Sequence, residues 1–335
     1  MALQTQTALT LDLRVERFAY HQPFRISGHV FTETALLVAT LSDGQHVGRG
    51  EGAGVYYLGD DIDHMLAQAT SVREAIERGA SRQDLQEMLP PGGARNALDC
   101  AYWDIEAKQA GRPVRELAGL ESPRPLLSTL TLGADTPAAM AAAAQALDPL
   151  APVKVKLTGD LDNDIARLEA IRAARPEAWL GVDANQGYDI GTLASLMPVL
   201  IGLRIAQLEQ PLKRGRESDL DGFKRSIPFV ADESAVTLAD TASLVGRFDM
   251  VNIKLDKCGG LTEGLAIARE ARLLGLGVMV GNMMGSSLSM APSFLLGQLC
   301  DIVDLDGPTF LARDRVPGVS YRDGRVHCPS EIWGN

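Results

Sequence analysis

The second half of the chain alternates between short apolar runs and segments of helical periodicity. From residue 126 onward, apolar runs of strand length are separated by stretches in which apolar residues recur every three or four positions. One such stretch places Ile165, Leu168 and Ile171 on a single face, and another ends at Gly275. Strands that alternate with helices predict a parallel sheet, and eight of them predict a closed α/β barrel. The predicted strands cover residues 127–132, 153–157, 179–183, 205–209, 229–232, 250–255, 277–280 and 302–305.

The first part of the chain follows a different pattern. Alternating or β-branched apolar runs cover residues 9–18, 35–41 and 47–51. These runs predict a three-stranded antiparallel sheet. Residues 22–33, which contain proline and glycine, are expected to form a loop between the first two strands.

Helices should follow this sheet. The first is expected to begin near Asp61, and a second follows the capping box of Ser81 and Asp84. A third, over residues 94–110, has apolar residues at helical spacing and stops at Gly111. We therefore expect three parts, which are an α+β capping domain over residues 1–125, a barrel domain over 126–306, and a tail over 307–335 that packs back on the capping domain.

Composition narrows the function class. The chain has 335 residues, 46% of them hydrophobic, which is enough for a large core. Its net charge of −11 argues against a nucleic-acid surface or a polybasic membrane patch. Four scattered cysteines predict neither a zinc site nor a disulfide framework, and the N-terminus lacks the order of a signal peptide. We expect a cytoplasmic enzyme that acts on a small molecule, with a homo-oligomer left open.

Three carboxylates close three consecutive predicted strands. They are Asp183, Glu209 and Asp232. A single acidic residue after a strand is usually a helix N-cap, but the active sites of such barrels lie at the carboxyl ends of the strands, where these three residues would converge. Converging carboxylates repel one another unless a cation lies between them. Oxygen-only ligands suit one hard divalent ion such as Mg²⁺.

Lysines accompany the carboxylates at the same strand ends. Lys154 and Lys156 lie two residues apart on one strand and therefore point to the same side, whereas Lys254 follows a strand four positions further round the barrel. Two amines that face each other across a metal site suggest proton transfer at a carbon atom between them. The natural assignment makes Lys156 the base, with Lys154 lowering its pKa from the ordinary value of about 10.4.

These strand ends resemble those of the enolase superfamily, muconate-lactonising-enzyme subgroup, over essentially the whole chain. The resemblance implies a (β/α)7β-type modified TIM barrel with an α+β capping domain. It also implies Mg²⁺ at the three carboxylates, which would stabilise an enediolate while Lys156 and Lys254 act on opposite faces. Asn185 and Glu233 would lie near the metal ligands, and Ser286 near the substrate carboxylate. The motifs that carry it are Lys154-Val-Lys156, Asp183-Ala-Asn185-Gln186, Glu209-Gln-Pro211, Ala231-Asp232-Glu233-Ser234, Asn252-Ile-Lys254-Leu-Asp256-Lys257 and Gly281-Asn-Met-Met-Gly285.

Within this subgroup the sequence most resembles the dipeptide epimerases. Asp304 and Asp306 alternate at the end of the eighth strand and would face the same way. A similar pair binds the N-terminal amine of the dipeptide in those enzymes. A plain turn at Asp306-Gly307-Pro308 is the structural alternative. The expected reaction is therefore inversion of the α-carbon of the C-terminal residue of a dipeptide by two-base proton transfer.

The first loop departs from the pattern of epimerases that act on alanyl-glutamate. Those enzymes tend to carry an arginine a few residues after a Pro-Phe pair, where this chain has His29 and Val30, so Arg25 is the nearest cation. Arg25, His29 and Tyr57 are the expected substrate contacts of the loops, and Tyr56 with Tyr57 would shape an apolar or aromatic pocket. Glutamate as the second residue of the dipeptide is therefore in doubt.

Four alternative functions remain open at this point. Racemisation of an N-acylamino acid such as N-acetylglutamate, or a succinylbenzoate-synthase-like reaction, would use the same lysines and metal. A Schiff-base aldolase also places a lysine on a barrel strand. A metal-dependent binding protein without catalysis is the non-enzymatic alternative. Within the superfamily, the dipeptide reading is the one that uses Asp304 and Asp306 to bind an ammonium group, because the substrates of N-acylamino acid racemases and succinylbenzoate synthases carry no such cation.

Overall fold

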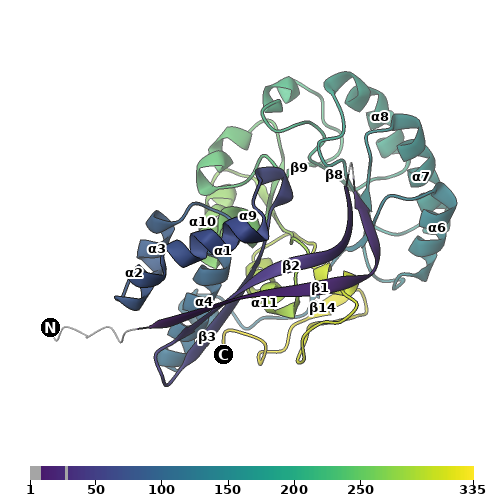
Figure 1. The fold of residues 1–335 in the computed structure, drawn as a ribbon. Coiled ribbons are helices and arrows are strands. Elements are labelled where there is room, and N and C mark those ends of the chain that lie inside the picture. Colours follow the sequence, from purple (N-terminus) through teal and green to yellow (C-terminus); the bar gives the residue numbers. More distant parts are fainter. Residues whose placement is uncertain (1–8, 27–28) are drawn as a thin grey trace.

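The chain folds around an eight-stranded parallel sheet whose strands follow the order β12-β11-β10-β9-β8-β7-β6-β5 (Figure 1). The computed structural model describes residues 9–26 and 29–335, without the side chains of residues 25, 26 and 29. Hydrogen bonds from Thr129 N–H to Val303 O (2.9 Å) and from Leu305 N–H to the Ser128 hydroxyl (3.0 Å) join the two ends of the sheet. The strands are β5 (Leu130–Leu132), β6 (Val153–Lys156), β7 (Leu180–Asp183), β8 (Gln207–Glu209), β9 (Phe229–Ala231), β10 (Met250–Ile253), β11 (Gly277–Val280) and β12 (Ile302–Val303).

Helices connect the strands and cover the outside of the sheet, as the alternating pattern predicts. The connections after β8 and β9 contain short 3-10 helices, whereas the other connections between barrel strands contain α-helices. The predicted strand 250–255 stops earlier than expected, because Lys254 is the N-cap of a short helix. The connecting helices are α6 (Pro137–Ala146), α7 (Leu161–Ala174), α8 (Ile190–Gly202), η2 (Glu217–Leu220), η3 (Leu238–Leu244), α9 (Leu255–Cys258), α10 (Leu261–Leu273) and α11 (Ser287–Gly297).

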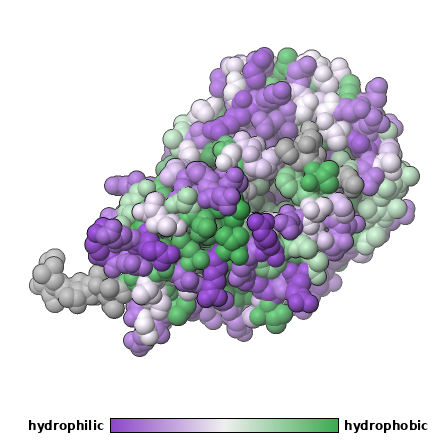
Figure 2. Space-filling view, viewed as in Figure 1, coloured by the Kyte–Doolittle hydropathy of each residue, from purple (hydrophilic) through white to green (hydrophobic). Residues whose placement is uncertain are grey.

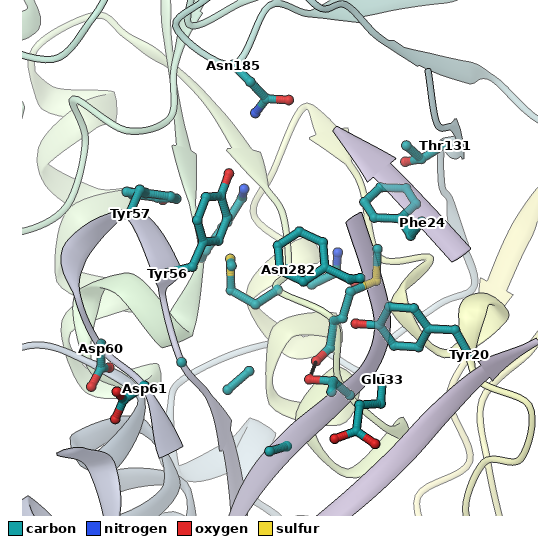
Figure 3. Close-up of a pocket in the computed structure, with 18 of the residues that line it drawn as sticks. Tyr20, Phe24, Glu33, Tyr56, Tyr57, Asp60, Asp61, Thr131, Asn185 and Asn282 are labelled. Atoms are coloured by element: carbon teal, nitrogen blue, oxygen red, sulfur yellow. Dashed lines mark hydrogen bonds between the residues drawn. The ribbon is translucent and has the colours of Figure 1, made fainter. Parts of the chain in front are cut away.

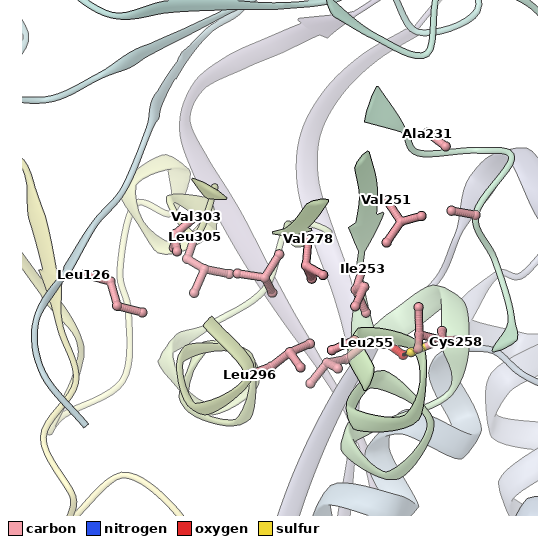
Figure 4. Close-up of a cluster of buried hydrophobic side chains, with 14 of the residues drawn as sticks. Leu126, Ala231, Val251, Ile253, Leu255, Cys258, Val278, Leu296, Val303 and Leu305 are labelled. Carbon is pink, nitrogen blue, oxygen red and sulfur yellow. Dashed lines mark hydrogen bonds between the residues drawn. The ribbon is translucent and has the colours of Figure 1, made fainter. Parts of the chain in front are cut away.

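The main hydrophobic core lies between the barrel strands and these helices. Strand residues such as Val251, Ile253 and Val278 point outward against Leu296 of α11 and Leu255 of α9 (Figure 4). These side chains are almost completely buried. The opposite faces of the same strands point into the barrel, where Asn252 and Lys254 of the same region are also buried. Alternation along each strand therefore separates core residues from site residues.

The predicted strand 127–132 is in fact two strands. Its first part, β4 (Leu126–Leu127), pairs antiparallel with β14 (Arg325–His327), which itself pairs with β13 (Ser320–Arg322). Only the second part joins the barrel. The chain turns between them because the Ser128 hydroxyl and the Thr129 amide bond to the segment around β12.

The N-terminal layer is a three-stranded antiparallel sheet in the order β1-β2-β3. Its strands are β1 (Thr10–Ile26), β2 (His29–Ser42) and β3 (Val47–Ala53). The loop expected over residues 22–33 is wrong for most of its length, because β1 and β2 continue as a paired hairpin, with a register shift between Ala19 and Phe24. Cross-strand pairing overrides the local turn signals of Pro23 there. The hairpin extends over the carboxyl end of the barrel (Figure 1).

Helix α4 (Gly93–Ala110) packs directly on β3. The contact is close because β3 presents glycines at alternate positions, Gly48, Gly50 and Gly52, so that no side chain separates the strand from the helix. A Cβ atom at Gly50 would lie 2.0 Å from the carbonyl oxygen of Ala97. The predicted capping box of Ser81 is present. The remaining helices of this layer are η1 (Tyr56–Leu58), α1 (Ile62–Ser71), α2 (Arg73–Glu77), α3 (Arg82–Met88) and α5 (Val114–Leu117).

The C-terminal tail packs on the N-terminal layer. After η4 (Gly307–Phe310), the Ala312 N–H bonds to Ala19 O at 2.8 Å. Near the end of the chain, the Trp333 indole N–H bonds to Cys100 O at 3.1 Å, which fixes the tail on α4. Among the described helices, none combines the length and apolar character that crossing a membrane requires.

Candidate active site

A pocket of about 550 Å³ lies at the carboxyl end of the barrel strands. Its floor is formed by charged residues of the strand ends, and its walls by the β1–β2 hairpin and the loop after β3. Figure 2 shows apolar residues gathered in the middle of this face, with polar residues around them. The pocket therefore combines a polar floor with walls that belong to the N-terminal layer.

Three buried carboxylates meet at the base of this floor, and of the three Asp232 lines the pocket itself. Asp183 ends β7, Glu209 ends β8 and Asp232 directly follows β9, and one oxygen of each lies within 4.8 Å of the others. Burial and the charge of Asp183 raise the pKa of Glu209 to about 7, against the opposing effect of Lys154. Burial also raises the pKa of Asp232, but Lys254 and Lys257 outweigh it and hold this pKa well below its usual value. Buried oxygen donors in this arrangement fit one divalent cation.

Neighbouring groups orient the three carboxylates. The Asn185 N–H donates to Asp183 Oδ1 at 2.9 Å, and Asn185 Nδ2 contacts Glu233 Oε1 at 3.5 Å. Asn185 has φ of +42° and turns the chain sharply beside Asp183. The structure therefore places Asn185 and Glu233 next to the three carboxylates, where the sequence predicted them.

Two further supports were not predicted. The Asn252 side chain donates to Glu209 Oε1 at 2.9 Å, and Lys257 Nζ contacts Asp232 Oδ1 at 2.6 Å. Asn252 lies two residues before Lys254 on the same strand, so alternation alone could have indicated that it faces the site. Lys257 follows the strand on α9, and no sequence pattern indicates where its side chain points.

The predicted lysines surround the carboxylates. Lys156 Nζ contacts Asp183 Oδ2 at 2.5 Å, and Lys254 Nζ contacts Asp232 Oδ2 at 2.6 Å. Both line the pocket, and they come from β6 and from the end of β10, which are four positions apart in the eight-stranded sheet. The two amines therefore approach the pocket from opposite sides of the barrel, as the two-base hypothesis requires.

Lys154 links the carboxylates to Asp304. Its Nζ lies 2.8 Å from Glu209 Oε2 and 2.7 Å from Asp304 Oδ2, and it lies 3.4 Å from Asp183 Oδ2. Burial opposes its charge, but Asp304 and Glu209 together raise its pKa well above the ordinary value. The sequence predicted only that Lys154 lowers the pKa of Lys156. The structure adds a direct contact of Lys154 with Asp304, which depends on closure of the barrel.

Asp304 and Asp306 both reach the pocket, as alternation after β12 predicts. Asp304 also accepts a hydrogen bond from the Thr129 hydroxyl, and Asp306 Oδ2 accepts one from the Thr131 N–H at 2.6 Å. Burial and the charge of Asp304 raise the pKa of Asp306 to about 7. A positive charge near these two buried carboxylates would relieve their repulsion, as the contact of Lys154 with Asp304 already does in part.

The other predicted substrate contacts differ in their placement. Tyr57 lines the pocket, and burial raises the pKa of its hydroxyl well above 10. The side chains of Arg25 and His29 lie outside the described part of the structure. Ser286 is not in the pocket lining, contrary to expectation. It is buried behind the pocket, where its N–H donates to Glu51 Oε1 at 2.8 Å and Arg315 Nε contacts its hydroxyl at 2.6 Å.

Asp256 supplies a link that the sequence motif did not explain. Its Oδ1 accepts hydrogen bonds from the Ala53 N–H and from Asn96 Nδ2, each at 2.8 Å. Ala53 lines the pocket and Asn96 belongs to α4. The segment that carries Lys254 is thereby fixed to the pocket wall of the N-terminal layer.

Comparisons with known proteins agree with this geometry. Residues 8–119 match the family model of the mandelate racemase / muconate lactonizing enzyme N-terminal domain, and residues 138–332 match the enolase C-terminal domain-like model. The chain is 38% identical over 320 residues to the L-Ala-D/L-Glu epimerase of Escherichia coli K12, which covers 95% of this chain and 99% of the relative. It is also 38% identical over 302 residues to an N-acetyl-D-glutamate racemase of a Pseudoalteromonas species, covering 89% and 95%.

Solved structures show the same fold. An enolase family member from Agrobacterium tumefaciens with homology to dipeptide epimerases, solved with sodium and L-Ala-L-Glu, has a TM-score of 0.94 at 38% identity over 97% of this chain and 100% of that chain. The dipeptide epimerase of Methylococcus capsulatus, complexed with Mg and L-Arg-D-Lys, has a TM-score of 0.89 at 30% identity over 96% and 97%. The chain therefore belongs to the mandelate racemase and muconate lactonizing enzyme family of the enolase superfamily.

Proposed function

We propose that this protein is a Mg²⁺-dependent dipeptide epimerase that inverts the α-carbon of the C-terminal residue. The observation that carries the proposal is the pocket floor, in which two lysines from opposite strands flank three carboxylates and a pair of aspartates lies beside them. Relatives that share this chain's fold at 30–38% identity include enzymes named as dipeptide epimerases.

Asp183, Glu209 and Asp232 would hold the cation. When bound, a divalent cation supplies positive charge against the negative charge that develops on the substrate carboxylate as the α-proton leaves. In the structure, burial lowers the pKa of Lys254 but Asp232 outweighs it, so this pKa lies well above 10.5. A cation that engages Asp232 would remove this raising effect, which favours a neutral amine able to accept a proton.

With the cation bound, the proton transfers need only the two lysines and the pair Asp304 and Asp306. One lysine accepts the α-proton from one face of the substrate, and the lysine on the opposite side returns a proton to the other face. Asp304 and Asp306 receive the N-terminal ammonium, which fixes the distance from this amine to the reacting carbon. Single amino acids, or dipeptides bound in the opposite direction, would not satisfy this distance. The N-terminal layer closes the site over the substrate.

Deuterium uptake from D₂O tests the proposal. A panel of L,L-dipeptides incubated with the Mg²⁺-loaded enzyme should include members that gain one deuterium at the C-terminal α-carbon and yield the L,D epimer, as measured by mass spectrometry and chiral chromatography. An absence of exchange across the panel, with exchange of N-acylamino acids instead, would show that the proposed substrate class is wrong.

Racemisation of N-acylamino acids is the second candidate, and the Pseudoalteromonas relative supports it. The pair Asp304 and Asp306 favours the dipeptide, because an N-acyl group carries no positive charge for two buried carboxylates. Borohydride trapping of the enzyme with substrate would detect the Schiff-base alternative.

Stability should respond to pH and metal together. Glu209 has a folded pKa of about 7 against 4.5 in a free chain, so its protonation stabilises the folded state below pH 4.5 and this contribution is lost as pH rises through 7. Asp232, whose pKa is lowered, acts in the opposite sense only at acidic pH below its ordinary value of 3.8. In EDTA, the melting temperature should therefore fall from pH 5 to pH 8, and Mg²⁺ should raise it more at pH 8 than at pH 5.

Thermal unfolding followed by circular dichroism, in EDTA or in Mg²⁺, measures the melting temperature at pH 5 and pH 8. The variant Glu209→Gln should lose most of the Mg²⁺ effect. A Mg²⁺-induced rise in melting temperature that is equal at pH 5 and pH 8 would contradict the assignment of Glu209 as a metal ligand.

A further inference from the structure

Aromatic side chains form part of the pocket wall next to the charged floor. Phe31 of β2 lies 5.6 Å from Tyr56, ring centre to ring centre, and Tyr56 lies 5.2 Å from Tyr57. Phe24 of β1 packs on Phe310 at 4.8 Å and also lines the pocket. Figure 3 shows the rings of Phe24 and Tyr56 on two sides of the space between the hairpin and the loop. This arrangement creates a cleft for a flat or bulky apolar group.

The positive charges of the described pocket lining are all paired. Lys154, Lys156 and Lys254 each contact a carboxylate of the floor. Arg17, which lies on the hairpin, contacts Glu33 Oε1 at 2.9 Å. An acidic substrate side chain would therefore find no described cation that lacks an anionic partner.

Negative charges are more numerous in the same wall. Glu33, Asp60 and Asp61 all line it. Asp60 accepts a hydrogen bond from the Gly93 N–H at 2.9 Å and contacts His64 Nδ1 at 3.0 Å, whereas Asp61 accepts one from the His64 N–H at 2.9 Å. The potential of this wall repels a second carboxylate and tolerates an apolar ring.

We propose that the preferred substrate carries a large apolar side chain, aromatic above all, on its C-terminal residue, and that the Arg17–Glu33 pair selects against acidic side chains there. The inference rests on the proposed dipeptide epimerase function and defines its substrate class. Phe24, Phe31 and Tyr56 contact the aromatic ring of the substrate. Glu33 pairs with the Arg17 guanidinium, which would otherwise bind a substrate carboxylate.

The selection has a physical basis on both sides. A buried phenyl ring gains from leaving water, whereas a carboxylate in the same cleft loses its hydration and finds no unpaired cation among the described side chains. The Arg17 and Glu33 side chains are 59% and 52% exposed, so their pair contributes little to folding stability. Its effect on specificity is electrostatic, and it should weaken as salt concentration rises.

Three dipeptides that share their first residue test the substrate class. With the Mg²⁺-loaded enzyme, kcat/KM for L-Ala-L-Phe and L-Ala-L-Leu should exceed that for L-Ala-L-Glu by about tenfold or more. Equal or faster turnover of L-Ala-L-Glu would overturn the inference and leave the epimerase function intact. No exchange with any dipeptide would contradict the proposed function itself, and the inference with it.

The role of the ion pair is tested by Glu33→Gln. Releasing Arg17 should raise kcat/KM for L-Ala-L-Glu by about tenfold, the size of one favourable charge contact, and leave L-Ala-L-Phe within about twofold. The gain should shrink in 0.5 M NaCl, which separates it from a purely structural change.

A matched control removes a similar pair outside the pocket. Asp12→Asn breaks the contact of Asp12 with Arg14 (2.7 Å), which is also an exposed pair on β1. It should leave both dipeptides unchanged. If Glu33→Gln does not change the ratio of L-Ala-L-Glu to L-Ala-L-Phe turnover, or if Asp12→Asn changes it equally, the assignment of the pair is wrong.

Phe31→Leu should lower kcat/KM for L-Ala-L-Phe more than for L-Ala-L-Leu.

Discussion

Lys254→Ala should abolish epimerisation, lowering kcat by roughly 10³-fold or more, yet preserve α-proton exchange with one of the two epimers. The reason is geometric. Lys156 would still reach its own face of the substrate from β6, so it can remove and return a proton there without inverting the carbon. Lys156→Ala should show the reverse selectivity.

Nuclear magnetic resonance of each pure epimer in D₂O measures the two exchange rates separately. Lys213→Ala, an exposed lysine outside the pocket lining, is the control and should behave as the wild type. Equal exchange of both epimers in either pocket variant would contradict the two-base assignment. Melting temperatures of the variants, measured with Mg²⁺, show whether any loss reflects unfolding instead.

Asp306→Asn should lower kcat/KM for dipeptides by about 10²-fold, because it removes one member of the pair proposed to receive the substrate ammonium. The side-chain oxygen of asparagine can still accept the Thr131 N–H, so the local backbone contact survives. Asp306 is the better position to change. Asp304 contacts Lys154, which also contacts Glu209, so a change there would also alter the carboxylates proposed to hold the metal.

An N-acetylated dipeptide completes the comparison. The wild-type enzyme should turn it over poorly, since it has no ammonium, and Asp306→Asn should not reduce this rate further. This non-additivity isolates the contact between the carboxylate and the amine. If Asp306→Asn reduces turnover of the free and the acetylated dipeptide by the same factor, Asp306 has another role.

Much of the charged pocket floor could be predicted from the sequence, because its residues lie where apolar strands end. Asp183, Glu209 and Lys156 each end an apolar strand, and parallel strands bring their carboxyl ends to the same edge. The register pairs Lys156 with Asp183 and Asp183 with Glu209, so neighbours in the motif order are neighbours in space. A cation site and proton transfer followed from these positions, whereas the epimerase reaction followed from the family resemblance.

Other features depend on contacts that local patterns do not encode. The extension of β1 and β2 through residues 22–33 arises from pairing between the strands, which outweighs Pro23. Ser286 resembled a substrate contact, but its position is determined by Glu51 and Arg315, which are distant in the sequence. The contact of Lys154 with Asp304 joins strands near opposite ends of the sheet order, so it exists only once the barrel closes.

The glycines of β3 have a consequence beyond packing. Because α4 rests directly on the strand backbone, the depth of that helix is determined by the absence of three β-carbons. Asn96 on this helix holds Asp256, two residues after Lys254. A single methyl group at Gly50 would displace the helix, and with it the contact that aligns the segment of Lys254 with the pocket wall. The position of the proposed base Lys254 is thus determined partly by an interface in another layer of the protein, away from the pocket floor.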